Sequence, residues 1–73
     1  MNKQELQQRA SDKAFAKMSM LLITIEQNIQ DIRTGNYGGV TLDEMELVLK
    51  CNKVELKVWR YITELIEKSN KNG

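Results

Sequence analysis

The sequence predicts a small all-α protein that forms one domain, and three observations lead to this prediction. The chain has 73 residues and no proline, and three of its four glycines fall within positions 35–39. That cluster is the one strong turn signal in the sequence. Apolar residues on both sides of it recur at helical spacings of three and four. We expect a single domain over residues 1–73, with flexible ends at residues 1–10 and 69–73.

The first half of the chain is expected to form one long amphipathic helix. Ser11 is a candidate N-cap, because its hydroxyl can accept a hydrogen bond from an unpaired N–H of the first turn. Gly35 stands where the residue after the helix belongs, since glycine readily takes the left-handed conformation that closes many helices. The predicted apolar stripe consists of Phe15, Met18, Leu22, Ile25, Ile29 and Ile32, widened by Ala14 and Leu21.

Three apolar residues of this helix lie off the main stripe. Ala16, Met20 and Ile23 are roughly 140° away from it at 100° per residue. They are either ordinary exposed residues or, because they align on one face, the contact with a second chain. The second interpretation predicts that Met20→Asp or Ile23→Asp disturbs association.

The loop at residues 35–39 leads to a second helical half that opens with a capping box. In this arrangement Thr41 caps the backbone N–H of Glu44, and the Glu44 side chain reaches back to Thr41. Asp43 and Glu44 also favour the positive end of the helix dipole. We therefore expect a helix to begin directly after Thr41.

The apolar residues of positions 41–68 fall into two phases. One group centres near roughly 230° and the other near roughly 95° around the helix axis. We favour a break near residues 51–53, where Asn52 can supply a turn conformation. The alternative is one long helix that forms a helical hairpin and is buried on both sides in an oligomer. The group near roughly 230° is Leu42, Met45, Val48 and Leu49, and the group near roughly 95° is Val54, Val58, Trp59, Tyr61, Ile62, Leu65 and Ile66.

A chain of this size usually needs a further source of stability. Cys51 is the single cysteine, so an intrachain disulfide is impossible, and the absence of histidine disfavours a zinc site. Self-association remains, and we expect a homodimer formed through the long first helix. The longest apolar run, residues 18–25, is too short to span a membrane. With no evident signal peptide, the free thiol favours a cytoplasmic protein without a membrane partner.

Catalysis is not expected from this composition. Histidine, the commonest general base, is absent. We interpret Cys51 as a small, buried structural residue in the turn and not as a nucleophile. Gly38 and Gly39 lack the strand and the Lys-Ser/Thr pair of a phosphate-binding loop. We predict no catalytic residue, no metal, no cofactor and no small-molecule substrate.

A row of basic residues is the strongest candidate for a binding site. Lys50, Lys53, Lys57 and Arg60 are spaced by three, four and three, so they share one helix face. The net charge of the chain is only +1. Such a row can neutralise DNA phosphates, or it can be a solvated face that keeps a small protein soluble.

Residues 41–67 resemble the helix-turn-helix unit of small bacterial and phage regulators. The stretch Thr-Leu-Asp-Glu-Met-Glu-Leu-Val-Leu-Lys is followed by Cys-Asn-Lys and then by Val-Glu-Leu-Lys-Val-Trp-Arg-Tyr-Ile. The resemblance implies that Val58, Trp59 and Ile62 pack inward while Lys53, Lys57 and Arg60 face the DNA groove. The sequence departs from this family at the turn, where the usual glycine is absent.

Two functions follow from these observations. The first is a non-enzymatic DNA-binding transcriptional regulator that places a basic third helix in the major groove. The second is a phage- or bacterium-encoded interaction module, an inhibitor or antirepressor, that binds a larger protein through apolar helix patches. Its expected contacts are Ala16, Met20 and Ile23, together with an exposed Leu56.

Overall fold

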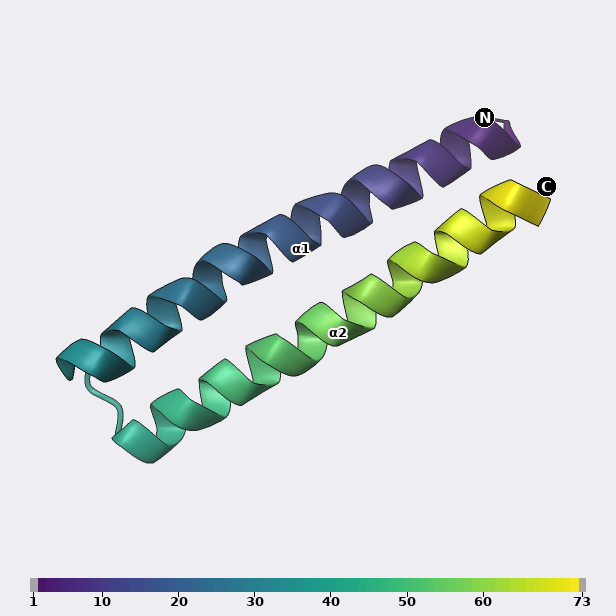
Figure 1. Ribbon diagram of the computed structural model, residues 1–73. Coiled ribbons are helices and arrows are strands. Elements are labelled where there is room, and N and C mark those ends of the chain that lie inside the picture. The colour runs from purple at the N-terminus through teal and green to yellow at the C-terminus, as the bar shows by residue number, and fades with distance from the viewer. Residues whose placement is uncertain (1, 73) are drawn as a thin grey trace.

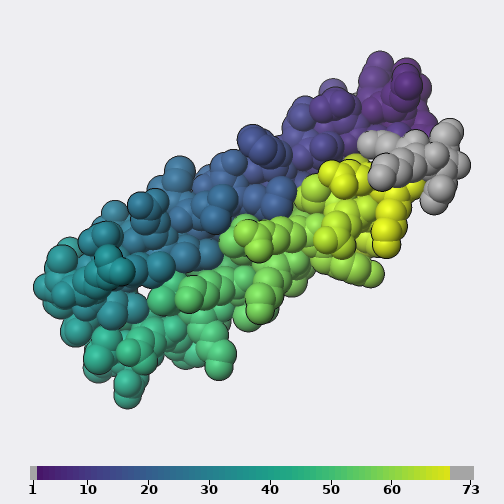
Figure 2. All heavy atoms as spheres, in the orientation of Figure 1, coloured from purple at the N-terminus to yellow at the C-terminus, as the bar shows by residue number. Residues whose placement is uncertain are grey.

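The computed structural model describes residues 2–72, with side chains through residue 69, as two antiparallel helices joined by a short loop (Figure 1). Helix α1 spans Lys3–Thr34 and helix α2 spans Leu42–Asn72, and residues 2–72 contain no strand. The two helices lie side by side along an elongated rod of 49 × 17 × 14 Å (Figure 2). The all-α prediction is confirmed, in the form of the helical hairpin that was the alternative to a broken second half.

The ends of α1 are fixed by local hydrogen bonds. The Asn2 side chain caps the N-terminus by accepting from the backbone N–H of Glu5 at 2.9 Å. Because Asn2 is the N-cap, the predicted N-cap at Ser11 is wrong, and residues 3–10 are helical. At the other end Gly35 has φ 72°, and the N–H of Asn36 donates to the carbonyl of Asp31 at 2.9 Å. The predicted role of Gly35 is confirmed. Met1, Gly73 and the side chains of residues 70–72 lie outside the described residues, so the expected flexible ends fall partly there.

The start of α2 is the predicted capping box. The backbone N–H of Glu44 donates to Thr41 Oγ1 at 3.1 Å, and the backbone N–H of Thr41 donates to Glu44 Oε1 at 3.3 Å. Two of the unpaired donors at this helix end are therefore satisfied.

The two helices meet along what we call the inner seam, in which buried or half-buried residues alternate at spacings of four and three. This is the heptad pattern of a coiled coil, in which each helix turns a narrow stripe to its neighbour. Leu21, Ile25 and Leu56 form its centre, with Met18, Ile29, Leu49 and Trp59 packed against them. The seam positions with this spacing are Gln7, Ser11, Ala14, Met18, Leu21, Ile25, Asn28 and Ile32 from α1, and Met45, Leu49, Asn52, Leu56, Trp59, Thr63 and Ile66 from α2.

Polar pairs within the inner seam fix how the helices align. Within the seam the Asn52 amide donates to Asn28 Oδ1 at 2.8 Å, and at its exposed end the amide of Gln7 donates to Ser69 Oγ, outside the seam, at 3.1 Å. The Asn28–Asn52 pair is half-buried, so any shift of one helix along the other would leave two amides without these partners. A polar residue in a coiled-coil seam sets the register in this way.

Parts of the buried stripe of α1 are displaced from the predicted stripe by one position along the chain. Ala14 and Leu21, expected only to widen the stripe, are buried, whereas Phe15 and Leu22 are 70% and 52% exposed. One neighbouring helix covers only a narrow stripe, so an apolar band of three positions per heptad cannot be wholly buried by α2.

The predicted break at residues 51–53 is wrong, because α2 runs without interruption from Leu42 to Asn72. Asn52, expected to form a turn, lies in mid-helix with its side chain bonded to Asn28. The described residues therefore contain no third helix and no helix-turn-helix angle. The expected exposure of Leu56 is also wrong, because it is only 8% exposed and belongs to the core.

The hairpin has a small core and a large surface. Among residues 2–69, whose side chains are described, five are buried: Ala14, Leu21, Ile25, Met45 and Leu56. The accessible surface is 5770 Å². A compact monomer of 8.5 kDa would expose about 4,700 Å². The hairpin therefore exposes about 1,100 Å² more than a compact chain of its mass, as its elongated shape implies.

Candidate interaction surface

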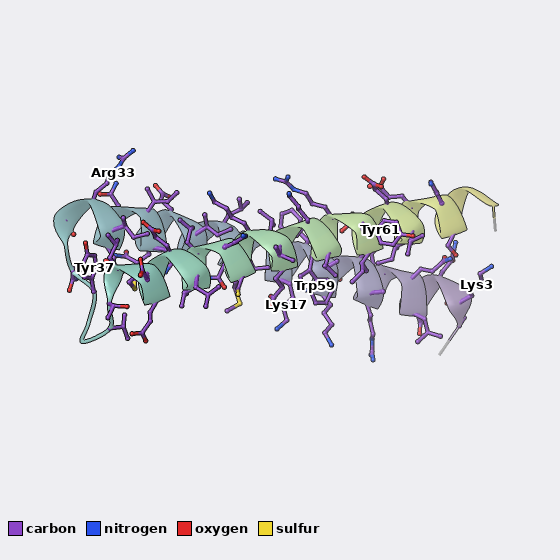
Figure 3. The ribbon with its side chains drawn as sticks, turned by 90° about the horizontal axis from the view of Figure 1, so that it is seen from below. Lys3, Lys17, Arg33, Tyr37, Trp59 and Tyr61 are labelled. Atoms are coloured by element: carbon purple, nitrogen blue, oxygen red, sulfur yellow. The ribbon has the colours of Figure 1, made fainter. Side chains whose placement is uncertain are left out.

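A second apolar row runs along α2 on the side away from α1, and we call it the outer seam. It is offset by two residues from the inner seam, which places it roughly 200° around the helix. Leu47 and Tyr61 are 61% and 60% exposed, and the other residues of the row are also exposed. Figure 3 views the hairpin from the α2 side and labels Tyr61, a member of this row, beside the core residue Trp59. The outer seam consists of Leu47, Cys51, Val54, Val58, Tyr61 and Leu65.

The outer seam keeps the same alternation of four and three as the inner seam. It does so over six consecutive positions, so it spans about 27 Å at 1.5 Å per residue. A shallow groove of about 360 Å³ opens at its N-terminal half, lined by Leu47, Lys50, Cys51, Val54 and Glu55. A straight apolar row with this spacing is the surface that one helix presents to another.

The four predicted basic residues lie together on one flank of α2, between the two seams. Lys50, Lys53, Lys57 and Arg60 are all exposed, as the sequence predicted. Acidic residues at the same helical positions bound the row at both ends. These are Asp43 and Glu46 before it, and Glu64 and Glu67 after it. The flank thus has a positive centre of about three turns between negative ends.

The predicted contact residues of α1 share one exposed face. Ala16, Met20 and Ile23 lie at α1 positions that point away from α2, with Met20 and Ile23 65% and 70% exposed. Leu56 does not join them, because it is buried between the helices. The α1 patch is shorter than the outer seam, since the same face continues with Lys13 and Gln27.

The outer seam was not predicted from the sequence, although its spacing is present there. The spacing of four and three from position 47 to position 65 is readable in the sequence. It was hidden because Val54, Val58 and Tyr61 were grouped with Trp59 and Ile66 into one stripe of a supposed third helix. In the structure these residues divide between two opposite faces of α2.

Other kinds of site find little support within residues 2–72. No group of three or more Cys, Asp or Glu side chains is placed to hold a metal ion among the described residues. Neither helix has a stretch that is both long and apolar enough to cross a membrane. Cys51 is exposed on the outer seam and not buried as expected.

Comparison of the chain with protein-family models, with curated proteins and with solved structures found no match.

Proposed function

We propose that this protein is a non-enzymatic interaction module, a helical hairpin that binds a polypeptide through the outer seam of α2. The observation that carries the proposal is that six successive seam positions are apolar and exposed along about 27 Å of one helix face. Isolated exposed apolar residues are common, but a contiguous row with coiled-coil spacing marks a helix-binding surface.

The charges beside the outer seam support a polypeptide ligand of defined orientation. Lys50 and Lys57 border one side of the seam, whereas Val48, Glu55 and Ile62 border the other. Flanking charges of this kind determine which helix a seam accepts and in which direction it binds. A protein of this class acts by occupying its partner's surface, as an inhibitor or antirepressor does, in the cytoplasm where Cys51 stays reduced.

A photo-crosslinking side chain introduced at Val54 tests the proposal in the cells that produce the protein. We expect a discrete covalent adduct with a polypeptide, because Val54 lies at the centre of the seam. The same crosslinker at Glu26, exposed on α1, serves as the matched control and should give none. The Val58→Glu substitution should remove the adduct, since it places a charge in the bound seam. Absence of any adduct at Val54 would contradict the proposal.

A second candidate function, DNA binding, is favoured by the basic row. Four exposed cations lie on one face of a straight helix, where they can contact phosphates without entering the groove. Without a separate recognition helix this contact would not read sequence. A duplex mobility shift that weakens steeply with salt would support this second candidate, and no shift at low salt would refute it.

A further inference from the structure

We propose that the ligand of the outer seam is the outer seam of a second copy of this chain, with the two α2 helices antiparallel. This inference rests on the proposed function and names its partner. Two features of the hairpin carry it, the surface left exposed and the fit of the seam residues to one another, and the charges beside the seam are compatible with it.

The exposed surface has the size that a dimer would remove. The hairpin exposes 5770 Å², about 1,100 Å² more than a compact monomer of its mass. Each partner in a stable interface loses about 800 Å². The hairpin buries only five of its described side chains, so pairing with a second copy would add apolar burial to a small core.

The outer seam is complementary to itself when it is reversed. Pairing the two copies about position 56 aligns all six residues in layers, with no seam residue left over. Leu47 meets the partner's Leu65, Cys51 meets the partner's Tyr61, and Val54 meets the partner's Val58. The smallest residue thus faces the largest, which is how facing positions fill a core evenly.

The parallel arrangement fits the same residues less well. It would place Cys51 against the partner's Cys51, which leaves a void, and Tyr61 against the partner's Tyr61, which crowds one layer. Voids and crowding inside a packed seam both destabilise it. The antiparallel arrangement avoids both.

The flanks of the seam are compatible with the antiparallel arrangement. On one side Lys50 lies beside the partner's Glu64, and symmetry repeats this pair of opposite charges. On the other side Val48, which is exposed, lies beside the partner's Ile62. Lys57 and Glu55 each meet their own copy near the two-fold axis at the solvent-exposed rim. Exposed charges there interact weakly and are screened by salt.

The first experiment compares the molecular mass of three forms of the full chain by sedimentation over a range of concentrations. We expect the wild type to reach twice the chain mass. Val54→Glu/Val58→Glu should remain monomeric and helical, because the inner seam is untouched. The matched control Met20→Glu/Ile23→Glu alters equally exposed apolar residues on α1 and should still dimerise. A monomeric wild type overturns the proposal, and so does a dimer that only the α1 variant dissociates.

The second experiment determines the orientation by measuring the distance between spin labels in the dimer. The label is attached at Glu67→Cys in a Cys51→Ser background, since residue 67 is exposed near the C-terminus of α2. In the antiparallel dimer residue 67 is level with position 45 of the partner. The two labelled backbones are then about 35 Å apart. A separation below about 20 Å, expected for parallel helices, would overturn the orientation.

The crosslinking at Val54 separates the failure of this inference from the failure of the proposed function. An adduct of twice the chain mass supports the second copy as the ligand. An adduct with a different polypeptide, together with a monomeric wild type, overturns the second copy while leaving the interaction module in place. No adduct overturns both.

Discussion

Truncation of Leu56 to alanine should destabilise the hairpin much more than the same truncation at Leu22. Leu56 is 8% exposed and packs in the centre of the inner seam, whereas Leu22 is 52% exposed on α1. The chemical change is identical, so the difference between the two variants reports burial alone. The pair is informative because the sequence pattern predicted the reverse, with Leu22 in the core stripe and Leu56 exposed.

The expected magnitudes follow from these exposures. Removing a buried leucine side chain costs about 2–3 kcal/mol when the surroundings can partly collapse, as in this thin core. Removing a half-exposed leucine side chain costs about 1 kcal/mol or less, and the higher helix propensity of alanine offsets part of that loss. A chain of 73 residues has about 4–11 kcal/mol of stability in total. Leu56→Ala should therefore remove roughly a fifth or more of it.

The assay is thermal and urea unfolding followed by circular dichroism, with both variants at the same protein concentration. We expect Leu56→Ala to lower the Tm by about 10–20 °C and Leu22→Ala by less than about 8 °C. Equal concentrations are needed because any association adds to the apparent stability. An equal or larger loss for Leu22→Ala would refute the placement of the two residues and, with it, the register of the hairpin.

Three further predictions concern the polar groups. Asn28→Ala should lower the free energy of unfolding in urea by about 1 kcal/mol, because it breaks the half-buried hydrogen bond with Asn52. The double variant Asn28→Ala/Asn52→Ala should lose less stability than the two single variants summed. Strictly additive losses would exclude this pair. Thr41→Ala removes the cap of α2 and should cost about 1 kcal/mol, measured by thermal unfolding, so an unchanged Tm would contradict the capping box. Lys57→Glu/Arg60→Glu should abolish any duplex mobility shift while leaving the circular dichroism spectrum unchanged, and a normal shift in this double variant would remove the basic row from DNA binding.

The local features that the sequence predicted correctly are those that depend on a few neighbouring residues. Gly35 ends α1, and the Thr41–Glu44 box begins α2. Both need only the chemistry of one helix turn. The N-cap at Asn2 was missed because the polar residues 2–13 offer several possible starts, and the periodicity of the apolar stripe begins only after them.

The features that the sequence left open depend on which surface each helix meets. Phe15 and Ala14 are adjacent, and helical spacing alone fits either as a core position. The choice is made by α2, which covers one narrow stripe. The pairing of Asn28 with Asn52 depends on the alignment of the two helices and cannot be read from either helix separately.

The break in α2 was predicted for a related physical reason. Two apolar phases in one segment arise either from two helices with one stripe each or from one helix with two stripes. The pattern is the same in both cases. The single helix was disfavoured because it leaves an apolar face without a cover within one hairpin, and the outer seam is that face. The candidate site is therefore the part of the molecule where the sequence pattern conflicted with a soluble monomer.

The reactivity of Cys51 in intact cells tests most directly whether the outer seam is covered by another polypeptide. The thiol is exposed in the hairpin and lies within the seam. We predict that alkylation of Cys51 in cells is slower than in the dilute purified protein by about tenfold, because the thiol reacts only in the uncovered fraction of molecules. Glu26→Cys in a Cys51→Ser background, exposed on α1, should react equally fast in both. Equal rates for Cys51 in cells and in dilute solution would contradict the proposed function.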